Sequence, residues 1–353
     1  MNSEKILRGV PRARYGAFGG ITPFPICVKA VSDFLGDELD YTFAIISGGG
    51  AFRFVWDTTM WNPGNVDIML TYEDAETVFR NCIQALGREF RMLWRAGMDW
   101  HPGSGTKNDF MAFIREQIDL GRPVISLGPI GPAEAGVITG YKDDGNTLLG
   151  WSVFQDWAWK NFSDEGYFVT DKWWDTGDFY GVMSFGEITG QRFSTKKIIE
   201  NAVLALRGRS EGNYAKGIAA YDYWKNAIHN VTENDFIVTG TGINDVHNVM
   251  MCQGDATDCL IDGRRNACKY FTKLAEENPG QPLYGKIAEW FGIVAKVINS
   301  GIYATLGGYE RGPQQIKALA QPENRSRICD YIDEMKNADM NALVLMEELL
   351  GIL

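Results

Sequence analysis

The chain has 353 residues, enough for two modest domains or for one large core with a helical extension. Hydrophobic residues make up 45% and charged residues 22%, a balance that is typical of folded globular proteins and argues against disorder. The net charge is −11 and no basic stripe is present, so a nucleic-acid partner is not expected, because phosphate binding depends on Lys and Arg.

Neither an export signal nor a membrane helix is expected. Residues 1–15 contain basic side chains but no apolar core, and no stretch approaches the roughly 20 apolar residues that span a bilayer. The cysteines Cys252, Cys259 and Cys268 cluster in sequence but lack the CxxC spacing of zinc sites. We therefore expect a cytoplasmic protein with free thiols, no metal, no cofactor and no membrane partner.

The first part of the chain predicts an α+β domain over residues 1–190. Short runs rich in β-branched or aromatic residues, bounded by Gly, Pro or Asp, predict strands. These runs are 43–47, 123–127, 136–141, 147–151 and 180–185. The Asp144-Gly145 step between the third and fourth runs predicts a hairpin, so their strands should pair antiparallel.

From Ser194 onward the apolar pattern becomes helical. Ser194 can cap a helix whose apolar residues recur at a spacing of three and four. Gly and Pro residues separate further predicted helices, which cover 214–229, 245–275, 283–305 and 324–349. We expect an all-α domain over residues 191–353, packed on the first domain.

The most informative segment of the first domain surrounds Cys27. Pro23 gives an extended entry and Pro25 suits the first turn of a helix. Cys27 would then lie in that first turn, where the helix dipole and free amides favour a thiolate. The alternative is a core thiol on the apolar face of the same helix.

The order of elements that follows Cys27 resembles the papain-like superfamily. Residues 113–125 predict a helix that leads into a "GRPVI" strand at 121–125, and a "VITGY" hairpin strand follows at 137–141. The resemblance is to the bacterial double-glycine and bacteriocin-processing peptidases, and to the N-terminal domain of the butirosin biosynthesis acyltransferase. That domain also pairs an early cysteine with a Gly-rich segment, here 47–54. The resemblance covers residues 15–190 and implies that Cys27 is the nucleophile of a hydrolase or acyltransferase acting on an amide or thioester of a small substrate.

At the positions where this resemblance implies the catalytic partners of Cys27, the sequence has other residues. Glu134 stands where a catalytic histidine is expected, seven residues before Tyr141. No carboxylate follows the next strand before Asp156, and no oxyanion glutamine precedes Cys27. A carboxylate beside Cys27 opposes thiolate formation, and it lacks the near-neutral pKa with which imidazole protonates a leaving group.

Only three histidines could rescue the chemistry. His101 lies in a loop of the first domain and is the first candidate for a base, because loops carry function more often than helical faces do. His229 and His247 belong to the helical half and could reach Cys27 only if that half covered the site.

Aromatic residues suggest a second function, that of a pseudoenzyme that binds a ligand. Trp56 beside Arg53, and Trp151 near Gln155, could form the aromatic wall and polar contacts of a cleft for a small molecule or peptide. A tryptophan-rich core explains the same residues. Gly48-Gly49-Gly50 lacks the Lys-Ser/Thr of a P-loop and is better explained by a tight turn or close backbone approach. The sequence leaves open whether the protein forms a homo-oligomer.

Overall fold

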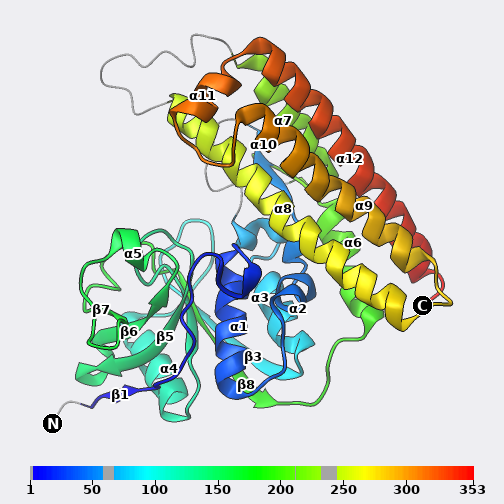
Figure 1. Cartoon of the computed structure of the whole chain (residues 1–353). Helices are drawn as coiled ribbons and strands as arrows, with labels where there is room; N and C mark the ends of the chain where they lie inside the picture. The colour runs from blue at the N-terminus through cyan, green and yellow to red at the C-terminus, as the bar shows by residue number, and fades with distance from the viewer. Residues whose placement is uncertain (1–2, 59–66, 211, 232–244) are drawn as a thin grey trace. The chain divides into compact units, whose positions relative to one another are not determined.

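The computed structural model describes residues 3–58, 67–210, 212–231 and 245–353 (Figure 1). The chain is α+β, with an antiparallel sheet in its N-terminal half and helices in its C-terminal part, as predicted. It forms two compact units: unit 1 is Met1–Ala44 with Ile83–Phe193, and unit 2 is Ile45–Cys82 with Ser194–Leu353. The division therefore differs from the expected one at 190/191 chiefly because residues 45–82 belong to unit 2.

The sheet of unit 1 is antiparallel throughout its described strands. Its order is β3-β8-β4-β5-β6-β7, and β1 also pairs with β5. The strands are β1 Lys5–Ile6, β3 Arg88–Trp94, β4 Val124–Leu127, β5 Ala135–Lys142, β6 Thr147–Ser152, β7 Phe168–Thr170 and β8 Gly181–Ile188. Four predicted strands are thus confirmed as β4, β5, β6 and β8. Strand β3 was not predicted, because charged residues interrupt its apolar pattern.

The predicted hairpin joins β5 to β6. Gly136 pairs with Ser152 at one end and Lys142 with Thr147 at the other. Between the strands, Asp143, Asp144 and Gly145 all have positive φ, at 52°, 58° and 98°. Asp and Gly tolerate this region better than other residues do, which is why the turn is readable from sequence.

Two helices pack on this sheet. Helix α1 (Pro23–Leu35) contacts β5 and β4, and α4 (Lys107–Asp119) contacts β5, β4 and β8. A capping box of Thr106 and Asp109 begins α4. The short α5 (Gln155–Ala158) follows β6.

The strand predicted at 43–47 is wrong. These residues form helix α2 (Tyr41–Ser47), which the Asp40 carboxylate starts by accepting a hydrogen bond from Phe43 N–H at 2.6 Å. Because a short apolar run is buried in either structure, its β-branched and aromatic content did not distinguish helix from strand. The boundaries between the two units fall inside α2 and inside α3 (Glu76–Ala85).

In its described residues, unit 2 is helical apart from one two-stranded ribbon. Its helices are α6 Thr195–Arg207, α7 Ile218–Asn230, α8 Asp245–Glu277, α9 Leu283–Val297, α10 Tyr303–Leu306, α11 Pro313–Leu319 and α12 Pro322–Leu350. The long helices α8, α9 and α12 run alongside one another (Figure 1). The predicted cap of α6 is confirmed, since Ser194 Oγ accepts a hydrogen bond from Lys197 N–H at 3.2 Å.

The ribbon shows why residues 45–82 belong to unit 2. Strand β2 (Val55–Asp57) pairs antiparallel with β9 (Tyr214–Lys216), so the start of the helix predicted at 214 is a strand instead. Gly217, with φ 61°, separates β9 from α7. Phe54 and Trp56 then enter the helical core, where Phe54 packs against Trp224 at 5.5 Å between ring centroids.

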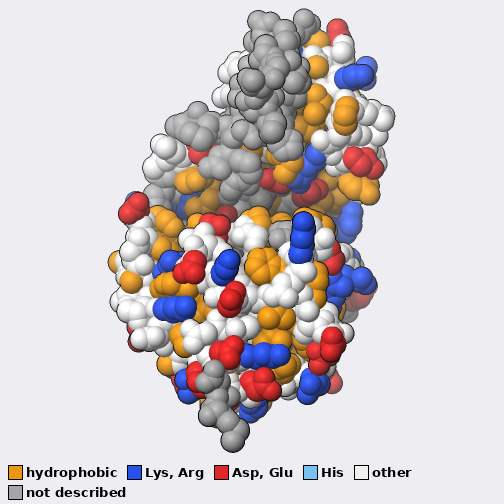
Figure 2. All heavy atoms as spheres, turned by 90° about the vertical axis from the view of Figure 1, so that its left-hand side faces the viewer, with side chains coloured by type: hydrophobic (Ala, Val, Ile, Leu, Met, Phe, Trp, Pro, Cys, Tyr) orange, Lys and Arg blue, Asp and Glu red, His pale blue; other side chains and the backbone are white. Residues whose placement is uncertain are grey.

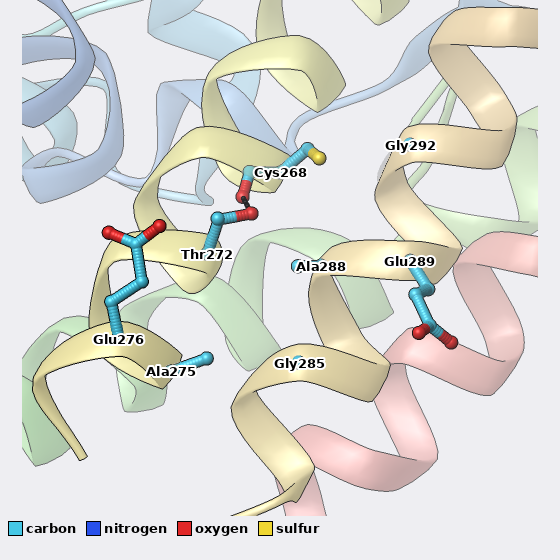
Figure 3. Close-up of a pocket in the computed structure, with 8 residues that line it drawn as sticks. All are labelled: Cys268, Thr272, Ala275, Glu276, Gly285, Ala288, Glu289 and Gly292. Carbon is cyan, nitrogen blue, oxygen red and sulfur yellow. Dashed lines mark hydrogen bonds between the residues drawn. The ribbon is translucent and has the colours of Figure 1, made fainter. Parts of the chain in front are cut away.

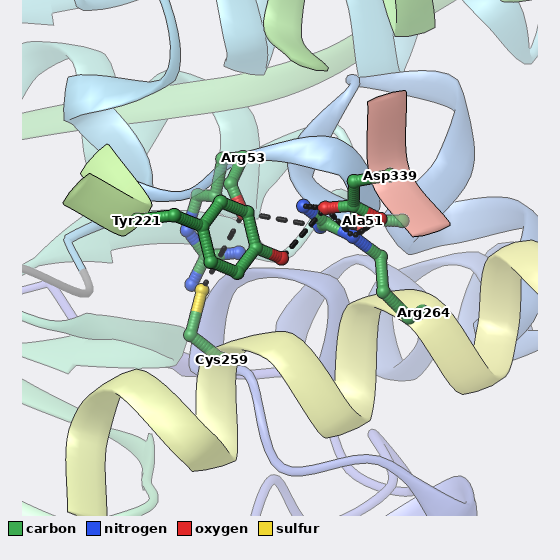
Figure 4. A network of polar contacts seen from close by, with 6 residues as sticks. All are labelled: Ala51, Arg53, Tyr221, Cys259, Arg264 and Asp339. Atoms are coloured by element: carbon green, nitrogen blue, oxygen red, sulfur yellow. Dashed lines mark hydrogen bonds and ion pairs between the residues drawn. The ribbon is translucent and has the colours of Figure 1, made fainter. Parts of the chain in front are cut away.

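A fully buried arginine ties this segment to the helices (Figure 4). Arg264 on α8 is paired with Asp339 on α12 at 2.7 Å, and neither side chain is exposed. The same guanidinium donates hydrogen bonds to the carbonyls of Ala51 and Arg53 at 2.6 and 3.2 Å. Tyr221 on α7 donates its hydroxyl to Asp339 at 2.7 Å. One buried cation therefore joins three helices and the segment before β2.

Replacing Arg264 by Ala should lower the free energy of unfolding by about 3–5 kcal/mol, because Asp339 is left as an unpaired buried charge. Chemical denaturation followed by circular dichroism measures this. The double variant Arg264→Met with Asp339→Leu should be more stable than Arg264→Ala. Arg207→Ala is the control, since its ion pair with Glu347 is exposed and should cost about 1 kcal/mol or less. Equal losses for Arg207→Ala and Arg264→Ala would contradict the central role of Arg264.

Candidate functional site

Cys27 lies deeper in its helix than predicted. Helix α1 begins at Pro23, with Thr22 as the N-cap, so Cys27 is in the second turn. The N–H of Ile26, one residue earlier, already donates to the Thr22 carbonyl at 3.3 Å. The free amides of the helix start therefore end before Cys27, and the expected first-turn position is wrong. Pro23 and Phe24 occupy the positions closest to the helix start, and neither is a nucleophile.

The surroundings of Cys27 oppose a thiolate. Its side chain is 0% exposed. Burial, and secondly the charge of Glu134, raise the pKa of the Cys27 thiol. Glu134 is half-buried just before β5, and its charge acts on Cys27. The pair brings together a neutral thiol and an opposing carboxylate.

His101 is engaged with aromatic rings. Its imidazole stacks on Trp94 with ring centroids 4.2 Å apart and meets the edge of Trp100 at 5.7 Å. Its Nδ1 is buried without a hydrogen-bond partner. Within the described residues, the His101 ring makes these contacts and no hydrogen bond to Cys27 or Glu134. His229 is exposed near the end of α7 in unit 2, and the side chain of His247 lies outside the described part of the chain.

Arg53 and Trp56 are core residues of unit 2. The Arg53 side chain is 4% exposed and donates through Nη1 to the Gly50 carbonyl at 2.8 Å. Trp56 is 2% exposed and stacks on Trp224 at 6.2 Å. The preceding glycines have a packing role, because a Cβ on Gly49 (φ 85°) would lie 2.0 Å from the Tyr72 hydroxyl. This agrees with the close backbone approach predicted for the Gly-rich segment.

Trp151 and Gln155 lie in unit 1 and are likewise buried. The Trp151 indole donates to the Val10 carbonyl at 2.9 Å. Gln155 accepts a hydrogen bond from Ser152 N–H at 3.1 Å and donates to the Gly166 carbonyl at 3.1 Å. Their polar atoms are thus used to hold the backbone around β6. Whether any of the four predicted ligand-binding residues contacts a ligand stays a prediction.

An exposed aromatic surface flanks Gln155 along the chain, with Phe154 before it and Trp157 two residues after it. Tyr15, Phe154 and Trp157, here called the aromatic platform, form a three-ring cluster in unit 1. Tyr15 and Trp157 stack with centroids 5.4 Å apart and planes 5° apart, and Phe154 meets both edge-on at 5.8 and 5.4 Å. Trp157 is 66% and Tyr15 37% exposed. The spacing of three between Phe154 and Trp157, one helical turn, was the available signal.

A groove between α8 and α9 in unit 2 has a volume of about 520 Å³ (Figure 3). Small residues line it, with Glu276 and Glu289 at its sides, and the lining set is Cys268, Thr272, Ala275, Glu276, Gly285, Ala288, Glu289 and Gly292. The Thr272 hydroxyl already donates to the Cys268 carbonyl at 2.8 Å. Among the described residues, neither glutamate is hydrogen-bonded to the Cys268 thiol or to the Thr272 hydroxyl.

Acidic residues of α8 are held by one arginine. Arg311 pairs with Asp255 at 2.6 Å and with Asp258 at 2.7 Å, and Tyr303 donates its hydroxyl to Asp258 at 3.0 Å. Burial raises the pKa of Asp255 to about 6, although Arg311 opposes the shift. Across the residues with a defined placement, no group of three or more His, Cys, Asp or Glu side chains could hold a metal ion.

On the face that carries α5 and β7, the surface charge is not of a single sign. Figure 2 shows basic and acidic side chains interspersed there with apolar ones. Among the described helices, none is both long and apolar enough to cross a bilayer. All six cysteines are free thiols, as predicted.

Comparison with known proteins gives no family. No protein-family model matches the chain, and no curated protein matches its sequence.

Iodoacetamide should alkylate Cys268 first and Cys27 slowly, because Cys268 is half-buried and the other five cysteines are buried. Peptide mapping by mass spectrometry between pH 6 and pH 9 measures this, with Cys27→Ser as the blank. Glu134→Gln should leave Cys27 slow, since burial is the larger cause of its raised pKa. Fast labelling of Cys27 with an apparent pKa below about 8.5 would show a stabilised thiolate.

The stability of the protein should fall between pH 4 and pH 7 more steeply than that of Asp255→Asn. The pKa of Asp255 is about 6 in the folded state and about 3.9 when unfolded. Its protonated form is thus favoured by folding, and that stabilisation is lost as the pH rises through 6. Asp67, whose pKa burial also raises to about 6, contributes equally to both proteins. Urea unfolding at pH 4.5 and 7 tests this, and parallel pH dependences would refute it.

Proposed function

We propose that the chain is a binding protein on an α+β scaffold of the papain-like type, and that Cys27 is not a nucleophile. The observation that carries this is the placement of Cys27, which is fully buried in the second turn of α1 with the Glu134 carboxylate nearby. The thiolate is the nucleophilic form of cysteine, and reactive cysteines are partly exposed in electropositive surroundings. Cys27 has neither property.

The missing acid supports the same proposal. Amide cleavage requires a group that protonates the leaving nitrogen, usually an imidazole within hydrogen-bond reach of the reacting atoms. The only described histidine of unit 1, His101, is stacked on Trp94 and makes no hydrogen bond to Cys27. Glu134 beside a neutral thiol lacks the opposite charge that would activate it.

The aromatic platform supports a binding role. Large apolar side chains left exposed in a cluster mark interaction sites more often than isolated ones do. Trp157 and Tyr15 combine large apolar area with a polar group at one end, the combination that favours recognition surfaces. The ligand would be a peptide or small molecule that packs on these rings, at a site next to the predicted Trp151 and Gln155.

A cysteine hydrolase or acyltransferase is the second candidate. One observation favours it: Glu134 acts on Cys27 from the position that the papain-like resemblance assigns to a catalytic partner. Activity would require α1 to open at its start, so that Cys27 became accessible.

Turnover of a simple acyl thioester, S-acetyl-N-acetylcysteamine, separates the two candidates. We expect the same slow rate for the unmodified protein, Cys27→Ser and Cys268→Ser, because no thiolate is held at Cys27. Release of free thiol measures the rate. A rate lost in Cys27→Ser and kept in Cys268→Ser would establish the cysteine enzyme and refute the binding-only function.

A further inference from the structure

We propose that the aromatic platform binds an extended proline-rich peptide segment in the polyproline II conformation, and that Phe18 belongs to the same recognition surface. This inference rests on the binding function proposed above and names the class of ligand. It depends on three features of unit 1: a strained Phe18, an available Trp157 indole, and an ion pair next to the rings.

Phe18 has a backbone conformation that aromatic residues rarely adopt. Its φ and ψ are 57° and 13°, in the left-handed region. For a bulky residue this conformation is strained, and such strain persists only where the surroundings enforce it. Hydrogen bonds from Gly16 N–H to the Gly20 carbonyl at 2.9 Å, and from Gly20 N–H to the Ala17 carbonyl at 3.1 Å, close the loop around Phe18.

Burial in the core does not explain the strain, and the contact made by the Phe18 ring is with the Lys29 ammonium, 5.3 Å from the ring centre. The turn Ala17–Gly19 has no buried residue, and Phe18 is 37% exposed. A Cβ added at Gly16 or Gly19 would have nothing within 4 Å, so the tip of the loop lies in open space. Its base is fixed, because a Cβ on Gly20 would lie 1.9 Å from the Tyr41 ring. The chain thus holds an aromatic ring at the surface, three residues from Tyr15 of the platform.

The exposure of the platform favours an extended peptide over an enclosed small molecule. Small-molecule pockets bury most of their ligand's surface in a concavity, whereas a side chain that is 66% exposed, as Trp157 is, projects outward. Polyproline II segments dock onto aromatic surfaces, and their preformed backbone loses little entropy on binding. Aromatic rings that pack edge-on and in parallel, as here, present both faces and edges to such a segment.

Trp157 also offers the hydrogen-bond donor that this ligand requires. A polyproline II backbone makes no internal hydrogen bonds, so its carbonyls are free to accept. The Trp157 indole N–H has no acceptor among the residues that the structure describes, while Trp151 and Trp159 donate theirs to Val10 and Val169. Trp157 is therefore the indole of this segment that can donate to a ligand carbonyl.

Charged side chains next to Trp157 can form ion pairs or hydrogen bonds with ligand residues on either side of a run of prolines. Arg12 pairs with Asp156, which lies between Gln155 and Trp157, and its guanidinium lies 5.7 Å from the centre of the Trp151 ring. This pair is exposed, so it contributes orientation and specificity more than affinity.

Isothermal titration calorimetry with decaproline tests the inference, with a ten-residue Gly-Ser peptide and maltotetraose as comparison ligands. Decaproline should bind saturably and at least tenfold more tightly than either comparison ligand. Trp157→Ala should weaken it at least tenfold. Phe18→Gly should weaken it at least threefold without lowering the melting temperature, because glycine relieves the backbone strain. Tyr309→Ala, which removes another exposed aromatic ring, should bind like the unmodified protein.

Each other outcome is decisive. Binding of maltotetraose, but not decaproline, in a Trp157-dependent manner would overturn the peptide inference and leave the binding function standing. Equal affinity of decaproline for Trp157→Ala would overturn the platform as its site. A Phe18→Gly variant with unchanged affinity and a lower melting temperature would make Phe18 structural. Absence of saturable decaproline binding would overturn the inference. If thioester turnover also required Cys27, the proposed function would be overturned with it.

Discussion

The pairing of Arg264 with Asp339 is the interaction on which the helical unit depends. Removing both charges from water is costly, and the cost is offset because all three guanidinium nitrogens of Arg264 donate to an acceptor. Two of those acceptors are backbone carbonyls of Ala51 and Arg53, so a segment from the first quarter of the chain is bound to α8 and α12. Gly263 follows from the same arrangement, since a Cβ there would lie 2.3 Å from the Ala51 carbonyl oxygen.

Cys27 is removed from water in the same way as Arg264, but no opposite charge offsets the cost of ionising its thiol. Arg264 stays paired in the core because an opposite charge and two carbonyls surround it. Cys27 is equally buried, yet the charge that acts on it, Glu134, has the sign that opposes ionisation. A buried thiol next to a carboxylate remains neutral. The cysteine that the sequence predicts at a helix start is therefore a core thiol in the structure. The proposed loss of catalysis follows from this electrostatic difference.

The aromatic residues separate into a core set and a surface set that their identities do not reveal. Trp151 and Trp157 are six residues apart, but one is 8% and the other 66% exposed. Trp151 lies on a central strand with its indole bonded to the backbone, and Trp157 lies on a one-turn helix at the end of that strand. Composition indicated an aromatic cluster in this region, and only the packing around β6 showed which of its rings are exposed.

The sequence by itself determined the α+β class, four strands of the sheet, the Asp-Gly hairpin and the Ser194 cap, because each depends on local periodicity, turn chemistry or a side chain next to the backbone it bonds. The tertiary structure alone decided that residues 45–82 join the helical unit, that Cys27 lies one turn too deep to use the helix start, and that Arg53, Trp56, Trp151 and Gln155 are buried. These outcomes depend on contacts between residues far apart in the chain, such as Arg264 with Ala51, and no local pattern encodes them.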